Sequence, residues 1–129
     1  MTTILTFGTF DVLHVGHLRI LERAAALGDR LVVGVSSDAL NIAKKSRAPV
    51  FPQDERMHIV AALNCVDAVF LEESLELKRD YLLRYQADVL AMGDDWMGRF
   101  DEFSDICRVV YFQRTPSIST TAVIEKIRL

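Results

Sequence analysis

The chain has 129 residues, half of them hydrophobic and 26% charged, which suits one globular domain with its own core. Lysines and arginines number 15 against 18 aspartates and glutamates, and the formal net charge of −3 argues against a surface built for nucleic-acid backbones. No apolar run approaches the roughly 20 residues that span a bilayer, and residues 1–9 lack signal-peptide features, so we expect a cytoplasmic protein without a membrane partner.

Short apolar strands and amphipathic helices alternate along the chain. Residues 3–7 are apolar and β-branched and end at Gly8, which predicts a buried strand. Residues 15–27 carry apolar side chains at helical spacing, and Gly28 follows them as a typical helix-ending residue. Further elements are expected as a strand at 31–35, a short helix after Ser36-Ser37-Asp38, a basic loop at 44–51, a helix from Pro52 to about Asn64, a strand at 68–71, a helix at 75–85, strands at 89–92 and 108–112, and a helix at 119–127.

Three of these helices have apolar positions that we expect to face a core. They are Ile59, Ala62 and Leu63 in the first, Leu75, Leu82 and Leu83 in the second, and Val123, Ile124 and Ile127 in the third. Cys65 and Cys107 lie far apart, each in an apolar run, so we expect two reduced core thiols rather than a disulfide.

Continuous apolar strands that alternate with helices are typical of a parallel sheet covered on both faces. We therefore predict one α/β domain over residues 1–129: a Rossmann-like, doubly wound, five-stranded parallel sheet with helices on both faces. Ligands of such sheets bind outside the carboxyl ends of the strands, near the point where the strand order reverses. That edge is where we look for the functional residues.

The first strand runs into His14-Val15-Gly16-His17 at the start of a helix. The unpaired amides and the positive dipole end of a helix N-terminus attract phosphate, and Gly16 lets the backbone approach a bulky anion. His14 and His17 lie on one helical face, where each can donate a hydrogen bond to a phosphate oxygen. The alternatives are two structural cap histidines, or a zinc site that lacks a third ligand nearby. We favour phosphate binding.

Two later segments also follow predicted strands. After the fourth strand, Gly93-Asp94-Asp95-Trp96 places an indole at the ligand edge, as a flat face for a base or as an ordinary packed aromatic. Before the last helix, Arg114 offers a planar fork for phosphate. The hydroxyls that open this helix can act as caps or hold a phosphate as well; they belong to Ser119, Thr120 and Thr121.

These segments carry a family resemblance over nearly the whole chain. The run from Gly8 to His17 resembles the signature of the cytidylyltransferase-like nucleotidyltransferases. The segments 93–96 and 114–121 resemble those of the bacterial glycerol-3-phosphate cytidylyltransferases. The resemblance implies transfer of CMP from CTP to glycerol 3-phosphate, giving CDP-glycerol and pyrophosphate. It also implies Mg²⁺ carried with the triphosphate, small-molecule substrates and a homodimer, to which the apolar residues Val50 and Phe51 could contribute.

The resemblance assigns roles to individual residues of this chain. The implied catalytic residues are His14, His17, Lys44 and Arg114. The implied nucleotide-binding residues are these four together with Thr9, Phe10, Gly16, Gly93, Asp94, Trp96, Thr115, Ser119, Thr120 and Thr121. Asp11, Lys44 and Lys78 are implied to bind the phosphorylated alcohol, and no residue is assigned to a metal.

Two positions depart from the family pattern. The family commonly carries a second lysine two residues after Lys44, where this chain has Ser46 between Lys45 and Arg47. It commonly carries an arginine where this chain has Asn64. Both departures concern the acceptor, so another cytidylyl or adenylyl acceptor (a phosphosugar, phosphoethanolamine or flavin mononucleotide) stays open. The alternative from another class is a nucleotide-binding module without turnover.

Overall fold

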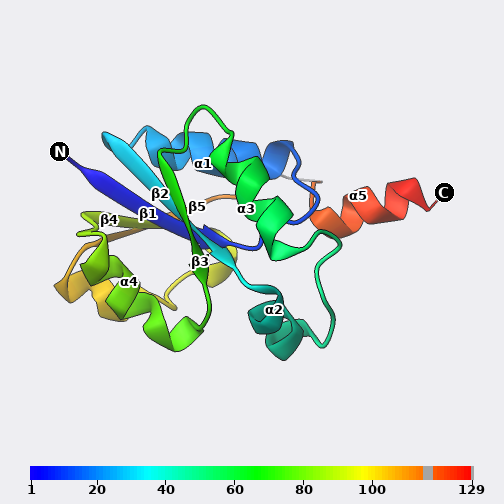
Figure 1. Ribbon diagram of the computed structural model, residues 1–129. Helices are drawn as coiled ribbons and strands as arrows, with labels where there is room; N and C mark the ends of the chain where they lie inside the picture. Colours follow the sequence, from blue (N-terminus) through cyan, green and yellow to red (C-terminus); the bar gives the residue numbers. More distant parts are fainter. Residues whose placement is uncertain (115–117, 129) are drawn as a thin grey trace.

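In the computed structural model, which describes residues 1–114 and 118–128, five strands form one parallel sheet in the order β3-β2-β1-β4-β5 (Figure 1). The strands are β1 (Thr3–Gly8), β2 (Arg30–Ser36), β3 (Ala68–Glu72), β4 (Val89–Gly93) and β5 (Arg108–Phe112). The chain builds outward from β1 to β3 and then crosses to the other side of β1 for β4. The strand order therefore reverses between β1 and β4, which confirms the predicted doubly wound fold.

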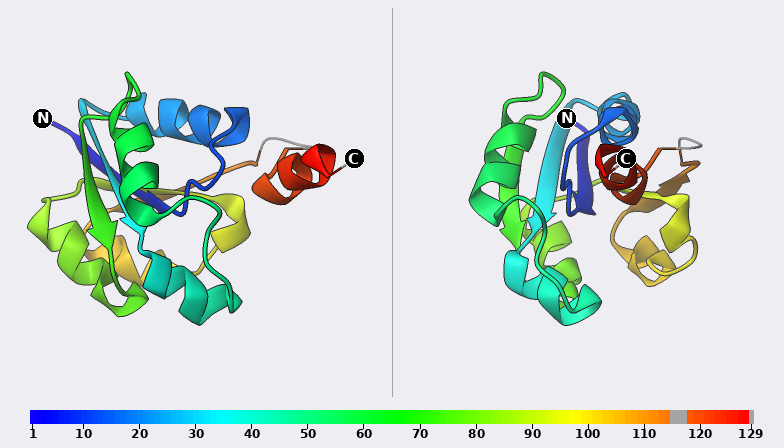
Figure 2. Two further views of the ribbon diagram at one scale, coloured as in Figure 1. Left: turned by 45° about the vertical axis from the view of Figure 1, so that its right-hand side comes forward. Right: turned by 90° about the vertical axis from the view of Figure 1, so that its right-hand side faces the viewer.

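The helices cover both faces of this sheet. They are α1 (Val15–Ala25), α2 (Asp38–Lys45), α3 (Gln53–Ala61), α4 (Lys78–Arg84) and α5 (Thr120–Ile127), with short 3-10 helices at Leu75–Leu77, Asp94–Trp96 and Asp101–Asp105. In Figure 1, α1 and α3 lie on one side of the sheet and α4 on the other, while α5 extends beyond the carboxyl ends of the strands. The right-hand view of Figure 2 has α5 in front of that edge.

Alternation along the strands separates two cores. Ile4 of β1 faces the core under α1 and α3, which includes Leu21 and Val60. Its neighbour Leu5 faces the core under α4, which includes Leu82. Successive side chains of a strand point to opposite faces, so a short run of consecutive apolar residues is buried on both sides.

The segment 44–51, which was predicted to be a basic loop, begins inside helix α2. Lys44 and Lys45 form the last turn of α2, because lysine is a good helix former. The helix ends at Ser46, which adopts the left-handed conformation with φ 59° and donates its backbone N–H to the carbonyl of Ile42 at 2.8 Å. The loop is therefore shorter than predicted, and Lys44 has a fixed backbone.

Several predicted inward positions are wrong. On α3, Ile59 and Ala62 are exposed, and Arg56 and Val60 are buried instead. Leu82 of α4 is buried as predicted. The exposed positions are Leu75, Leu83 and, on α5, Ile127, which is 75% exposed; Leu63, Val123 and Ile124 are half-buried. For Ile127 the reason is tertiary: α5 projects from the body of the domain instead of packing along the sheet (Figure 1).

Cys65 and Cys107 are free thiols, and both are half-buried. Burial raises the pKa of each thiol. Both therefore behave as small apolar side chains that pack against the two cores.

Candidate active site

A pocket of about 870 Å³ opens at the carboxyl ends of the strands. Most of the predicted site residues line it: Thr9, Phe10, Asp11, His14, Gly16, His17, Gly93, Trp96, Arg114, Ser119, Thr120 and Thr121. Lys44, Asp94 and Lys78 are not among its lining residues, and Thr115 lies outside the described residues. Lys45 and Arg47, which flank the departure at Ser46, do line it.

The two histidines of the motif form the cap of α1. His14 is the N-cap residue, and its Nδ1 accepts the backbone N–H of Gly16 at 3.0 Å. His17, three residues on, accepts the backbone N–H of His14 on its own Nδ1 at 3.2 Å. This reciprocal arrangement is a capping box built from two imidazoles. The rings stack with 3.8 Å between their centroids.

These cap bonds fix which nitrogen of each ring carries the proton. Since both Nδ1 atoms accept hydrogen bonds, the proton of the neutral ring must be on Nε2. Burial lowers the pKa of His14. Burial, followed by the nearby His14, lowers the pKa of His17 to about 4 against an opposing effect of Asp11. Nε2 of His14 is buried and has no hydrogen-bond partner among the described residues. The site thus offers neutral N–H donors.

Gly16 makes room for the His14 ring. A Cβ at position 16 would lie 2.8 Å from Cε1 of His14 and 3.1 Å from a methyl group of Ile118. Any side chain would therefore push the ring away or displace the segment before α5. The histidine geometry therefore favours glycine at this position, and the close approach of an anion stays a prediction.

The loop between β1 and α1 is strained and held from both sides. Phe10 and the β-branched Val12 have φ angles of 53° and 48°, a region that costs such residues on the order of 1–3 kcal/mol each. The Asp11 carboxylate accepts the backbone N–H groups of residues 50 and 51 at 2.7 and 3.0 Å. Its carbonyl accepts the hydroxyl of Thr120 at 2.8 Å. Asp11 thus orders the pocket rim, and its predicted contact with the acceptor stays a prediction.

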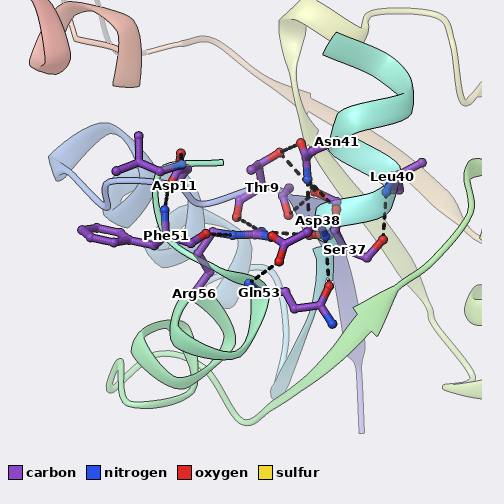
Figure 3. Close-up of polar contacts among 12 residues, drawn as sticks. Thr9, Asp11, Ser37, Asp38, Leu40, Asn41, Phe51, Gln53 and Arg56 are labelled. Atoms are coloured by element: carbon purple, nitrogen blue, oxygen red, sulfur yellow. Dashed lines mark hydrogen bonds and ion pairs between the residues drawn. The ribbon is translucent and has the colours of Figure 1, made fainter. Parts of the chain in front are cut away.

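Arg56 is fully buried beneath this loop, a position that the sequence did not indicate (Figure 3). Its guanidinium donates to the carbonyls of Thr9 and Ser36, both at 2.8 Å, and to that of Phe51 at 2.9 Å. It also pairs with the Asp38 carboxylate at 2.8 Å. One side chain therefore ties together the ends of β1 and β2, the start of α2 and the loop before α3.

Beside Arg56, Asn41 connects α2 to the same strand ends (Figure 3). Its amide donates to the carbonyl of Ser37 at 2.9 Å and to the hydroxyl of Ser36 at 3.0 Å. Its Oδ1 accepts the hydroxyl of Thr9 at 2.9 Å. The Thr9 side chain at the pocket wall therefore has a fixed orientation.

Of the predicted acceptor lysines, Lys78 lies behind one wall of the pocket and Lys44 is exposed. Lys78 is buried, with Nζ 3.0 Å from the Glu72 carboxylate. The same ammonium lies over the ring of Phe7, a pocket-lining residue, at 3.9 Å from its centroid. The side chain of Lys44 is exposed, yet partial desolvation lowers its pKa against an opposing effect of Glu72. The Glu72 carboxylate thus interacts with both lysines.

Trp96 is a packed aromatic residue at the pocket wall, and its role as a face for a base stays a prediction. Its ring stacks on Phe100 with 5.4 Å between centroids, and it also lines the pocket. Asp95 rather than Asp94 is the acidic residue of this segment at the pocket.

The start of α5 closes the opposite side of the pocket. Ser119 is the N-cap residue, and its hydroxyl accepts the backbone N–H of Ala122 at 3.0 Å. Arg114 is exposed and lines the pocket, and Arg23 of α1 donates to the carbonyl of the preceding Gln113 at 2.9 Å. The N-termini of α1 and α5 both border one pocket, which favours an anionic ligand.

Within residues 1–114 and 118–128, no three His, Cys, Asp or Glu side chains are grouped as a metal site. Over the same residues, no helix has the length and apolar character needed to cross a membrane.

Comparison with known proteins shows the family of this chain. The chain is 44% identical over 127 residues to the glycerol-3-phosphate cytidylyltransferase of Bacillus subtilis (strain 168), with 98% of each chain covered. It is 36% identical over 127 residues to that of Staphylococcus aureus, covering 98% of this chain and 96% of the relative. A lipopolysaccharide core biosynthesis protein from Thermoplasma volcanium shares the fold, with a TM-score of 0.79, 24% identity, and 89% of this chain and 98% of that chain covered.

A family model described as cytidylyltransferase-like matches residues 5–126, which contain all but the first two residues of β1, the four other strands and all but the last residue of α5. The chain belongs to the cytidylyltransferase-like family of nucleotidyltransferases, together with the bacterial glycerol-3-phosphate cytidylyltransferases.

Proposed function

We propose that this protein transfers CMP from CTP to glycerol 3-phosphate and releases pyrophosphate, giving CDP-glycerol. The observation that carries the chemistry is the pair of capping histidines, which line the pocket and whose Nδ1 atoms accept backbone N–H groups, so that the proton of each neutral ring is on Nε2. The identity of the substrates rests on the relatives, which match over almost their full length at 36–44% identity.

In the proposed reaction, a phosphate oxygen of the acceptor attacks the α-phosphorus of CTP in line. The new P–O bond forms as the bond to the β-phosphate oxygen breaks, and pyrophosphate leaves with that electron pair. The nucleophile is already an anion, so positioning and charge stabilisation supply the rate. His14 and His17 donate hydrogen bonds from Nε2 and stay neutral, because the pKa of each ring is lowered.

We assign the cations around the pocket to stabilising the negative charge that develops on the phosphates. Arg114 offers two parallel donors to the leaving pyrophosphate. Lys45 and Arg47 line the pocket beside the departure at Ser46 and can supply the positive charge that the family places there. Mg²⁺ is proposed to accompany CTP, held by phosphate oxygens and water, since it keeps several waters and favours oxygen ligands.

Lys44 and Lys78 are proposed to receive the phosphate of the acceptor. The other departure, Asn64, is exposed between α3 and β3, at the edge of the sheet opposite the pocket, and is not a lining residue. Asn64 is therefore not among the residues that we propose to contact the acceptor.

The experiment is a matrix of the four nucleoside triphosphates against glycerol 3-phosphate, phosphoethanolamine, a phosphosugar and flavin mononucleotide, scored by pyrophosphate release. We expect the CTP and glycerol 3-phosphate combination to exceed every other combination by at least about tenfold, because hydrogen-bonding sites reject mismatched partners strongly. A higher rate with another acceptor would replace glycerol 3-phosphate. Release with no combination, despite CTP binding, would indicate a nucleotide-binding module.

We also propose a homodimer. Its support is the exposure of Val50 and Phe51, at 58% and 38%, on a segment that Asp11 holds in place. Sedimentation of the protein and of the Val50→Ser/Phe51→Ser variant tests this proposal. A wild-type monomer at micromolar concentration would overturn it.

A further inference from the structure

Arg23 of α1 reaches the segment that leaves β5. Its Nη1 donates to the backbone carbonyl of Gln113 at 2.9 Å, and its guanidinium carbon lies 4.5 Å from the centroid of the Phe112 ring. Phe112 is the last residue of β5, and Gln113 directly precedes Arg114, which lines the pocket. The Arg23 side chain therefore fastens the backbone immediately before Arg114 to α1.

The segment that follows Arg114 is attached to the same part of the molecule. The hydroxyl of Thr120 donates to the carbonyl of Asp11 at 2.8 Å. Ile118 lies against the start of α1, where a Cβ on Gly16 would be 3.1 Å from one of its methyl groups. Arg114 thus lies between two attachments, one to the body of α1 and one to its N-terminus and the loop before it.

Helix α1 connects these attachments to the histidine cap. His14 is its N-cap residue, and Arg23 lies in its last turn. An α-helix has a fixed rise of about 1.5 Å per residue, so the backbone separation of these two positions does not vary. The helix therefore relates the position of the cap to the position of the backbone that carries Arg114.

Stability alone explains the hydrogen bond from Arg23 poorly. Arg23 and Gln113 are both exposed, and an exposed hydrogen bond adds little because water can replace either partner. The apolar stem of a long side chain would cover the Phe112 ring without a guanidinium group. The directed bond to the Gln113 carbonyl is the part that calls for another explanation.

We propose that Arg23 is a positioning residue of the nucleotide site, whose hydrogen bond to the Gln113 carbonyl holds Arg114 where its guanidinium meets the pyrophosphate part of CTP. This inference rests on the proposed function, which gives Arg114 that role. Arg23 is not a lining residue of the pocket and acts through Arg114. A contact of little value for stability can still matter for turnover, because small displacements of a positioned group are costly in rate.

The test is a double-mutant cycle that combines Arg23→Met with Arg114→Gln. Methionine keeps an apolar stem over Phe112 and removes the donor to Gln113. We expect kcat/KM for CTP to fall about fivefold or more in Arg23→Met, and further in Arg114→Gln. In the double variant, Arg23→Met should change the value of Arg114→Gln by less than about twofold, because the group that it positions is gone. The KM for glycerol 3-phosphate should stay within about twofold of wild type in Arg23→Met.

Binding of inorganic pyrophosphate provides a measurement that needs no turnover. By titration calorimetry, its Kd should rise about fivefold or more in Arg23→Met and in Arg114→Gln. The matched control is Arg19→Met, which removes another exposed arginine of α1 that does not line the pocket. This control should leave kcat/KM for CTP and the pyrophosphate affinity unchanged. Urea unfolding of Arg23→Met should be close to that of wild type, which separates positioning from a general loss of structure.

Three results would overturn the proposal. The first is a wild-type kcat/KM for CTP and a wild-type pyrophosphate affinity in Arg23→Met. The second is a pair of losses that multiply in the double variant, since independent effects would show that Arg23 does not act through Arg114. The third is wild-type kinetics in Arg114→Gln.

If Arg23→Met does not fold, Arg23→Lys takes its place in the same cycle, because its ammonium reaches less far and lacks the planar fork. Wild-type protein that releases no pyrophosphate from CTP and glycerol 3-phosphate would instead refute the proposed function. The pyrophosphate affinities would still decide whether Arg23 positions Arg114.

Discussion

The backbone N–H of His14 donates to Nδ1 of His17 at 3.2 Å, while the two rings stack at 3.8 Å. One arrangement therefore does two things: it caps α1, and it directs the proton of each neutral ring to Nε2. Helix capping and phosphate binding, which are competing explanations of the motif in sequence, are compatible because an imidazole has two nitrogens.

Replacing His17 should separate these two roles. In His17→Ala, turnover is expected to fall roughly 10²–10³-fold, the usual loss for one donor to a developing charge. In His17→Gln, the side chain can still accept the N–H of His14, as in an ordinary capping box, so the stability of α1 is retained while turnover still falls. Steady-state kinetics and thermal unfolding measure the two effects. Near-normal turnover in folded His17→Ala would contradict the assignment.

The low pKa of His17 also makes stability depend on pH. Its folded pKa of about 4 lies below the ordinary value of 6.5. Between these values the unfolded chain binds more protons, so the stability linked to neutral His17 is complete above about pH 6.5 and is lost as pH falls through 4. The contribution is at most roughly 3 kcal/mol.

Urea unfolding at about pH 7 and about pH 4.5 measures this dependence. Wild type should lose more stability on acidification than His17→Gln, which has no imidazole at that position. Equal losses in the two proteins would show that other groups, and not His17, control acid unfolding.

Gly16→Ala should reduce activity without unfolding the helix. Alanine favours helix interiors over glycine by about 0.5–1 kcal/mol. The new methyl group would lie 2.8 Å from Cε1 of His14, however, and must displace that ring. We expect circular dichroism close to wild type and a turnover at least about tenfold lower, since small misplacements of positioned groups are costly. Wild-type turnover would show that the His14 position is not critical.

Arg56→Gln should destabilise the whole domain. It removes a buried charge that pairs with Asp38 and donates to three carbonyls, and breaking a buried pair typically costs roughly 3–5 kcal/mol. The control is Arg79→Gln, which breaks an exposed pair and should leave the free energy of unfolding nearly unchanged. Urea unfolding compares the two. Similar stabilities would mean that the Arg56 network contributes little.

Most of the fold was predictable from local pattern. Five apolar runs and the helical spacing of 15–27 gave the parallel sheet and the edge at which the ligand pocket lies. The spacing of His14 and His17 predicted that both side chains lie together at the start of one helix, and the two rings do stack at the N-terminus of α1.

Contacts between distant segments were not predictable. Arg56 lies among polar residues and has the sequence appearance of an exposed helix position, yet it is fully buried. Likewise Lys78 has the pattern of an exposed lysine, and only the fold brings it against Glu72 and Phe7.

The sequence by itself therefore determined the strands, the positions of the candidate functional segments along the chain and the family. The tertiary structure alone decided which charged side chains are buried and which of them meet. The physical reason is that periodicity reports how one segment divides its own apolar and polar faces. A buried charge is stabilised by partners that other segments supply, and those partners leave no mark in the local pattern.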